Sequence, residues 1–252
     1  MTAVGNSRRA RRAEILKELG LTPLWRAKVT NAPNQAPAVE EAGSGEQVSG
    51  HGVVAAEDRR SEILRMGWDQ LKTSVEGCIA CPLCRSRSRT VFGVGDMNAD
   101  WLYVGEGPGA EEDATGEPFV GQAGKLLDNM LAAIDLKRGR NVYIANIVKC
   151  RPPGNRNPTT HEAHQCEPYL ARQIEMIKPK LIIALGKIAA QNLLHTDASI
   201  ASLRGRLHEH SGIPVIVTYH PAYLLRTLAD KAKVWEDLCF ARSAMQSLGT
   251  SE

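Results

Sequence analysis

The chain has 252 residues, of which 43% are hydrophobic, and its 31 basic and 28 acidic residues give a net charge of +3. This length and composition suit one sizeable α/β domain with appendages. No apolar run approaches the length of a membrane span, and the basic N-terminus lacks an apolar signal core. We therefore expect a cytoplasmic protein that binds no membrane. Its six cysteines are then expected to be reduced and to serve a metal rather than disulfides.

The N-terminal quarter of the chain differs in composition from the rest. Residues 7–20 combine four arginines with helically spaced apolar residues, which predicts a short basic helix within an N-terminal arm, residues 1–27. Residues 28–57 are rich in Ala, Pro, Gly, Ser, Gln and Glu and show no periodicity, which predicts a disordered linker. The folded domain is expected over residues 58–252.

Helix and strand patterns alternate through this domain. The patterns predict helices over residues 58–75, 160–176, 187–194 and 230–248, and strands over residues 101–104, 142–149, 181–185 and 214–219. A short strand is expected within residues 90–95, and a loop-rich insertion over residues 196–212. Because strands that alternate with helices pair in parallel, we expect a three-layer α/β/α fold around a four-stranded, mainly parallel sheet.

A glycine-rich loop follows the first of these strands and leads into a helix that carries Leu126 to Ile134. Its acidic residues are Glu106, Glu111, Glu112 and Asp113. Glycines in such a loop let backbone amides approach a ligand closely. Four carboxylates are unusual in a phosphate-binding loop, so a different kind of ligand is expected.

Polar residues stand at or just beyond the ends of the predicted strands: Glu106, Asn146 and His220, together with Gly186. The carboxyl ends of parallel strands share one edge of a sheet, so these residues are expected to meet in one crevice. A carboxylate, a carboxamide and an imidazole suit hydrolysis combined with recognition of a polar heterocycle.

Five cysteines are candidates for a metal site: Cys78, Cys81, Cys84, Cys150 and Cys166. The C-x2-C spacing brings neighbouring thiolates to one metal centre, and four thiolates suit either zinc or an iron–sulfur cluster. Five candidates compete for four positions, and Cys84 is the ambiguous one. Cys239, in the last helix, is expected to be part of the core.

Four motifs resemble those of the family 4 uracil-DNA glycosylases: residues 105–113, 116–124, 146–153 and 220–226. The resemblance extends from about Gly77 to Leu248. It implies the fold of that superfamily and a structural [4Fe-4S] cluster held by Cys78, Cys81, Cys150 and Cys166, with Cys84 outside the ligand set.

The resemblance also implies an activity, hydrolysis of the N-glycosidic bond of deoxyuridine in DNA. His220 would donate a hydrogen bond to the departing uracil, Asn146 would read its pairing edge, and Phe119 would stack on it. Glu106 would orient or activate the water, with Glu112 or Asp113 as alternatives, because other branches of the superfamily carry an aspartate where this chain has Gly107. The pocket lining would include Gly107 and Pro108, and the DNA contacts Leu224 as a wedge and Arg226.

The implied partner is uracil-containing DNA, single- or double-stranded, bound by a monomer. Arginines 85, 87, 89, 204 and 206 are weaker candidates for phosphate contacts. One alternative is a catalytically inactive, DNA-binding or polymerase-associated relative that keeps the cluster, and the intact set of Glu106, Asn146 and His220 argues against it. A ferredoxin-like carrier is a second alternative, but it requires a further set of closely spaced cysteines that this chain lacks.

Overall fold

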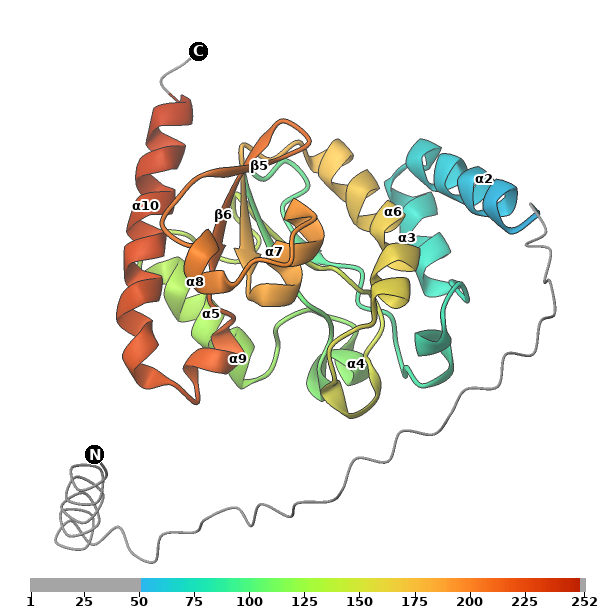
Figure 1. The fold of residues 1–252 in the computed structure, drawn as a ribbon, viewed down its shortest axis with the longest axis horizontal. Coiled ribbons are helices and arrows are strands. Elements are labelled where there is room, and N and C mark those ends of the chain that lie inside the picture. The colour runs from blue at the N-terminus through green and yellow to red at the C-terminus, as the bar shows by residue number, and fades with distance from the viewer. Residues whose placement is uncertain (1–50, 250–252) are drawn as a thin grey trace, which may run out of the picture. The chain divides into compact units, whose positions relative to one another are not determined.

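A computed structural model describes residues 51–249 of the chain. The predicted N-terminal helix and most of the predicted linker lie outside the described residues. Within them, six strands form one mixed sheet in the order β1-β3-β2-β4-β6-β5. Figure 1 shows this part of the chain as a ribbon. Their bounds are β1 Val94–Gly95, β2 Trp101–Gly105, β3 Val142–Asn146, β4 Leu181–Leu185, β5 His208–His210 and β6 Ile213–Thr218.

The four predicted strands form the parallel centre of this sheet, β3-β2-β4-β6. The short edge strands β1 and β5 pair antiparallel with β3 and β6. Strand β5 lies inside the segment expected to be loop-rich. It forms because Ser211 and Gly212 adopt positive φ angles of 51° and 80° and close a two-residue hairpin into β6.

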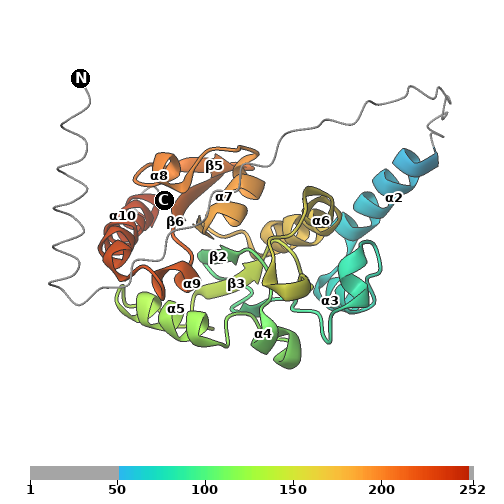
Figure 2. The ribbon, with the colours of Figure 1, turned by 60° about the horizontal axis from the view of Figure 1, so that its bottom comes forward.

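Helices cover both faces of the sheet, as Figure 2 shows. Leu102 and Val104 face one layer and Trp101 and Tyr103 face the other, since side chains alternate along a strand. The first layer contains α2 (His51–Arg65), α3 (Trp68–Glu76), α6 (Thr160–Ile177), α7 (Lys187–Leu194) and α8 (Ile200–Leu203). The second contains α5 (Gln122–Ala132), α9 (Pro221–Leu224) and α10 (Lys231–Gly249). The predicted three-layer α/β/α class is confirmed. Among the described residues, no helix is both long and apolar enough to span a membrane.

Several element boundaries differ from the sequence-based ones. The single helix expected over residues 58–75 is two helices, because Gly67 leaves the helical conformation and its N–H bonds to the side chain of Gln70 at the start of α3 (3.1 Å). Helix α2 begins at His51, so the last residues of the predicted linker are helical. The glycine-rich loop contains an unpredicted helix α4 (Ala110–Thr115), which ends at Gly116 with a positive φ of 84°.

Three short 3-10 helices complete the described chain: η1 (Pro82–Arg85), η2 (Pro153–Asn155) and η3 (Leu228–Asp230). Strand β3 is shorter than predicted and ends at Asn146. Its chain nevertheless stays beside the loop after β2, because Ile147 and Val148 donate to the carbonyls of Gly105 and Glu106 (2.9 and 3.2 Å). These two hydrogen bonds hold the segment after β3 beside the segment after β2, at the edge of the sheet where both strands end.

Candidate active site

A cavity of about 600 Å³ lies at the carboxyl edge of the parallel strands. We call it the strand-end cavity. Seven of the eight sequence-predicted catalytic and binding residues line it: Glu106, Gly107, Pro108, Phe119, Asn146, His220 and Arg226. The strand register explains their convergence, since Gly105 pairs with Asn146 and Leu185 pairs with Thr218. The residues that follow β2, β4 and β6 therefore meet Asn146 at one edge.

Asn146 is the most unusual polar group of this cavity. Its side chain is 2% exposed, and its Oδ1 atom has no hydrogen-bond partner among the residues that the structure describes. A buried amide oxygen without a partner costs free energy unless a ligand supplies a donor. Gly105 makes this placement possible, because a Cβ there would lie 2.5 Å from Oδ1 of Asn146 and 2.6 Å from Cζ of Phe119. The amide therefore faces the cavity with an acceptor left open.

His220 stands at the N-terminus of α9, and the N–H of Ala222 donates to its Nδ1 atom (3.1 Å). Burial, with a smaller contribution from Arg226, lowers the pKa of His220 from 6.5 to about 4. The imidazole is therefore neutral at pH 7, and its proton must be on Nε2 because Nδ1 accepts a bond. Its ring lies 5.4 Å from that of Phe119 between centroids. The site thus holds a neutral hydrogen-bond donor beside an aromatic surface.

The carboxylates of the glycine-rich loop have different environments. Glu112 accepts hydrogen bonds from the N–H groups of Gly109, Val120 and Gly121 (3.0, 2.9 and 3.1 Å). Its carboxylate therefore holds the two ends of the loop together.

Asp113 is buried and accepts from the N–H groups of Ser88 and Arg89 (2.9 and 3.4 Å). The side chain of Glu106, by contrast, makes no hydrogen bond or ion pair within residues 51–249. Burial raises the pKa of Glu106 above its ordinary value of 4.5. Of the two acids that line the cavity, Glu106 is thus the one free to act on a ligand or on water.

Four cysteines line a second, small cavity between α3, α6 and the end of β3: Cys78, Cys81, Cys150 and Cys166. We call it the cysteine cavity. Cys84, in η1, is absent from its lining. Nitrogen donors approach three of the sulfur atoms: Arg59 to Cys78 (3.7 Å), Arg87 to Cys150 (3.1 Å) and the N–H of Lys149 to Cys166 (3.3 Å). Donors of this kind stabilise the negative charge of metal-bound thiolates.

The chemistry of this donor set fits a metal cluster. Burial raises the pKa of Cys150 to about 11 and that of Cys166 to about 12, so these thiols keep their protons until a metal displaces them. No three His, Cys, Asp or Glu side chains in the described part of the chain are already arranged as a set that could hold a metal ion. The shared cavity, its nitrogen donors and the exclusion of Cys84 are what support a four-cysteine site.

Comparison with known proteins places this architecture in a family. The model of the uracil DNA glycosylase superfamily matches residues 92–239. The chain is 44% identical over 165 residues to a type-4 uracil-DNA glycosylase of Archaeoglobus fulgidus, an alignment that covers 62% of this chain and 82% of that protein. It is 44% identical over 179 residues to a type-4 uracil-DNA glycosylase of Thermotoga maritima, with 69% and 93% covered. The corresponding enzyme of Pyrobaculum aerophilum is 40% identical over 181 residues, with 69% and 92% covered.

The chain is a type-4 member of the uracil-DNA glycosylase superfamily. The family expected from the sequence motifs is thereby confirmed. Its type-4 relatives match most of their own length to this chain.

One predicted residue of this uracil-DNA glycosylase homologue lies elsewhere. Leu224, expected to act as a wedge in the DNA stack, is 1% exposed and packs in the core with side chains of α5 and α10. The wedge assignment is corrected on this ground, because a wedge must project from the surface. The short helix α9 turns Leu224 inward and leaves the next residue, Leu225, 44% exposed. Arg226 follows and lines the rim of the cavity.

Two tyrosines of this type-4 homologue, Tyr219 and Tyr223, line the strand-end cavity although the sequence reasoning did not select them. Their rings stack with centroids 5.1 Å apart, and the guanidinium of Arg204 lies 5.0 Å from the ring of Tyr219. Arg204 also pairs with buried Asp237 (2.7 Å), so it supports the cavity wall rather than a phosphate. Their positions directly before and three residues after His220 could have identified both tyrosines.

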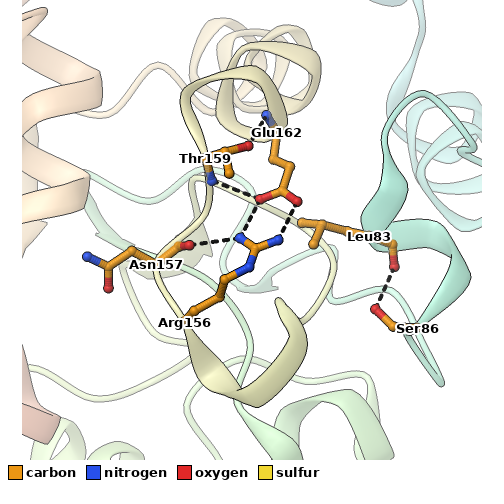
Figure 3. Close-up of polar contacts among 6 residues, drawn as sticks. All are labelled: Leu83, Ser86, Arg156, Asn157, Thr159 and Glu162. Carbon is orange, nitrogen blue, oxygen red and sulfur yellow. Dashed lines mark hydrogen bonds and ion pairs between the residues drawn. The ribbon is translucent and has the colours of Figure 1, made fainter. Parts of the chain in front are cut away.

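Figure 3 shows the polar contacts of Arg156, another residue of the cavity lining that the sequence reasoning missed. Arg156, which lines the strand-end cavity, donates to both carboxylate oxygens of Glu162 (2.8 and 2.7 Å). Glu162 is buried in the first turn of α6, and its carboxylate also accepts from the N–H of Thr159 (2.8 Å). In return, the N–H of Glu162 donates to Oγ1 of Thr159 (3.2 Å). The hydrogen bond from Arg156 is the main cause that lowers the pKa of Glu162 to about 2. The signal was present as the capping box Thr159-x-x-Glu162.

Proposed function

We propose that this protein is a uracil-DNA glycosylase that takes uracil out of the DNA stack and hydrolyses its N-glycosidic bond, which leaves an abasic site. The observation that carries the proposal is the unpaired Oδ1 atom of buried Asn146 beside the rings of Phe119 and His220. A flat heterocycle with an N–H donor fits that position. The type-4 uracil-DNA glycosylases among its relatives support the same substrate.

Asn146 explains how uracil is distinguished from cytosine. Its amide offers one acceptor and donors, so Oδ1 can accept from N3–H of uracil while the amino group donates to O4. Cytosine presents an acceptor at N3 and an amino donor beside it, which leaves the buried amide with mismatched partners. A site built on such hydrogen bonds rejects the wrong base strongly, since its buried polar groups are left unpaired. Phe119 supplies the stacking surface, and Gly107 and Pro108 line the pocket.

His220 and Glu106 divide the catalytic work. When the bond between C1′ and N1 breaks, its electron pair stays on uracil, and neutral His220 donates a hydrogen bond from Nε2 to the developing anion. The oxygen of a water molecule forms the new bond to C1′, and the carboxylate of Glu106 accepts the proton that this water loses. The bonds of Glu112 and Asp113 to backbone amides favour Glu106 over both alternatives.

DNA binding follows from the same edge of the sheet. A base must leave the stack to reach the strand-end cavity, and Arg226 at its rim is placed to contact a phosphate. Exposed Leu225, rather than Leu224, is positioned to enter the space that the base leaves. We infer a monomeric enzyme that acts on uracil-containing DNA in the cytoplasm.

A [4Fe-4S] cluster held by Cys78, Cys81, Cys150 and Cys166 completes the proposal. The cluster would cross-link the chain segments that carry these four cysteines. Its role would be structural, because hydrolysis of a glycosidic bond requires no electron transfer. Arg87 belongs to this region rather than to a DNA surface, because it donates to the carbonyls of Cys78 and Glu76 as well as to the sulfur of Cys150. Cys150 begins the loop that contains Arg156 and Asn157 of the cavity wall. These four cysteines thus anchor one side of the strand-end cavity.

The experiment that tests the proposal uses labelled oligonucleotides with a single uracil opposite guanine, opposite adenine or unpaired, and matched oligonucleotides with thymine or cytosine. We expect alkali-labile breaks at uracil alone. The variant His220→Ala is expected to lower cleavage far more than DNA binding, whereas His208→Ala, at a histidine outside the cavity lining, retains cleavage. Wild-type protein that breaks none of the substrates would refute the proposal.

A further inference from the structure

Phe119 is held in a backbone conformation that aromatic residues rarely adopt. Its φ angle is +55°, in the left-handed region, although it carries a bulky aromatic side chain that is only 6% exposed. Such a conformation persists only where the surrounding contacts impose it. Because this residue forms the aromatic wall of the strand-end cavity, whatever imposes its conformation also determines where that wall lies.

Arg138 binds the main chain on both sides of Phe119. The Nη1 and Nη2 atoms of Arg138 donate to the carbonyl oxygens of Pro118 and Phe119, each at 2.8 Å, and Nε donates to Asp128 (2.9 Å). One guanidinium thus binds the carbonyls on both sides of the strained residue and is itself oriented by a carboxylate from α5. A planar guanidinium has the rigid fork of donors that this arrangement needs.

A second, independent contact limits the same carbonyl. A Cβ atom at Gly124 would lie 1.8 Å from the carbonyl oxygen of Phe119 and 2.2 Å from its carbonyl carbon. The main chain of Phe119 therefore packs directly against the first turn of α5, where no side chain larger than glycine's hydrogen fits. The carbonyl is confined between Gly124 and Arg138. These contacts fix the main chain from which the ring projects.

We propose that Arg138 is a positioning residue that holds Phe119 in place for stacking on the extrahelical base. This inference rests on the proposed function. Arg138 does not line the strand-end cavity, so it acts through Phe119 and not on the substrate. Its loss should therefore affect base capture and turnover more than attachment to DNA, since a displacement of about 1 Å in a reacting group can reduce rate by about 10²-fold.

The decisive variant is Arg138→Lys. Lysine keeps the positive charge beside Asp128, but its ammonium is a point charge that cannot bind two successive carbonyls in one plane. Arg172→Lys is the matched control. Arg172 also donates to a backbone carbonyl, that of Met66 (2.8 Å), and pairs with Glu175 (2.7 Å), and its side chain is 18% exposed compared with 23% for Arg138. It lies on α6, outside the lining of the strand-end cavity.

The first measurement is kinetic. For Arg138→Lys we expect kcat on a uracil oligonucleotide to fall about 10- to 100-fold, DNA affinity to stay within about 3-fold of wild type, and inhibition by free uracil to weaken up to about 10-fold. Arg172→Lys should match wild type in all three. Arg138→Lys with wild-type kcat and unchanged uracil inhibition would overturn the inference.

The second measurement follows the ring itself. The chain has three phenylalanines, Phe92, Phe119 and Phe240, so protein labelled with 4-fluorophenylalanine gives a fluorine NMR spectrum that Phe119→Leu assigns. We expect Arg138→Lys to shift or broaden the Phe119 resonance alone. A Phe119 resonance identical to wild type would refute the proposal that Arg138 positions Phe119. Because this readout needs no activity, it remains decisive if wild-type protein proves unable to cleave uracil DNA, a result that would instead refute the proposed function. If Arg138→Lys fails to fold, Asp128→Ala, which keeps the fork but removes the carboxylate that accepts from Nε of Arg138, should produce the same changes at smaller size.

Discussion

The segment that follows β3 contributes residues to both the strand-end cavity and the cysteine cavity, and the two cavities treat their polar groups in opposite ways. In the strand-end cavity, the Oδ1 atom of Asn146 and the carboxylate of Glu106 have no hydrogen-bond partners within the described part of the chain. In the cysteine cavity, nitrogen donors approach the sulfur atoms of Cys78, Cys150 and Cys166. Unpaired polar groups are costly in a folded protein and persist where a ligand comes and goes.

The difference indicates what each cavity is built to hold. Open acceptors suit a substrate that must enter and leave, whereas sulfur atoms surrounded by donors suit a permanent group whose loss would weaken the fold. Substitutions in the strand-end cavity should therefore reduce activity and spare stability, and substitutions in the cysteine cavity should do the reverse.

Removal of a proposed cluster ligand should have the largest effect. We expect Cys166→Ser protein to be colourless, to lack iron and to lose several kcal/mol of stability, because metal binding of this kind is also folding free energy. The control is Cys84→Ser, which should keep its brown colour, iron content and thermal midpoint, since Cys84 does not line the cavity. Visible absorption, iron analysis and thermal unfolding measure these outcomes. Equal loss of iron in both variants would return Cys84 to the ligand set.

Glu106→Gln should lower kcat by about 10²- to 10⁴-fold, the usual contribution of a general base, with no loss of stability. Glu106 must be ionised to accept a proton, and burial raises its pKa above 4.5, so the wild-type rate should fall as pH drops through that raised value. His220, with a pKa of about 4, stays neutral over the same range and adds no limb between pH 5 and 8. A pH–rate profile by single turnover tests both points.

Glu111→Gln is the control for that profile, because Glu111 is an exposed acid of the same loop that does not line the cavity. It should keep the wild-type rate and the wild-type acid limb. An acid limb that survives unchanged in Glu106→Gln would assign the base to another group, and Glu112 would be the next candidate.

Asn146→Ala should lower kcat/KM by about 10²-fold, since the pairing edge of uracil would lose its partners. Its thermal midpoint should be equal to or above that of wild type, because the substitution removes a buried acceptor that has no partner. Asn192→Ala provides the comparison, since the amide of Asn192 is satisfied by the carbonyl of Ile188 (2.8 Å) outside the strand-end cavity. Asn146→Ala protein that was clearly destabilised would show that the amide serves the fold.

The parallel centre of the sheet could be predicted from sequence because each strand is a short run of mostly apolar residues that stands between helical patterns. Once the strands are parallel, geometry alone brings the residues after them to one edge, which is why Glu106, Asn146 and His220 could be grouped. The edge strand β5 was missed because its three residues carry no apolar pattern, and only the Ser211–Gly212 turn signals it.

What could not be predicted depends on contacts between distant parts of the chain. The inward direction of Leu224 is set by the packing of α9 against α5 and α10, which no local pattern reveals. An acidic residue at a helix start, such as Glu112, reads equally well as a cap or as a catalytic group until its amide partners are known. The fork from Arg138 to the carbonyl of Phe119 spans 19 residues and leaves no sequence signature.

The smallest expected effect concerns Glu162. It binds Arg156 of the strand-end cavity and lies in the first turn of α6, the helix that also carries Cys166 of the cysteine cavity. Glu162→Gln should cost about 1 kcal/mol at pH 7, because a buried carboxylate that accepts from Arg156 is lost, while glutamine can still accept from the N–H of Thr159 and keep the cap. The pKa of Glu162 is about 2, below its ordinary value of 4.5, so its carboxylate stabilises the fold above pH 4.5, and this contribution disappears as pH falls toward 2. The difference in unfolding free energy between wild type and Glu162→Gln should therefore shrink from pH 7 to pH 3.

Glu175→Gln, on the same helix, removes an ion pair between Arg172 and a Glu175 side chain that is 59% exposed, and should change the stability only slightly. Because Arg156 loses its carboxylate partner in Glu162→Gln and keeps the carbonyl of Asn157, the cavity wall that it forms should also loosen, and KM for uracil DNA should rise by about 3-fold. A pH-independent stability difference with an unchanged KM would mean that Glu162 caps α6 and nothing more, and that the two cavities are structurally independent.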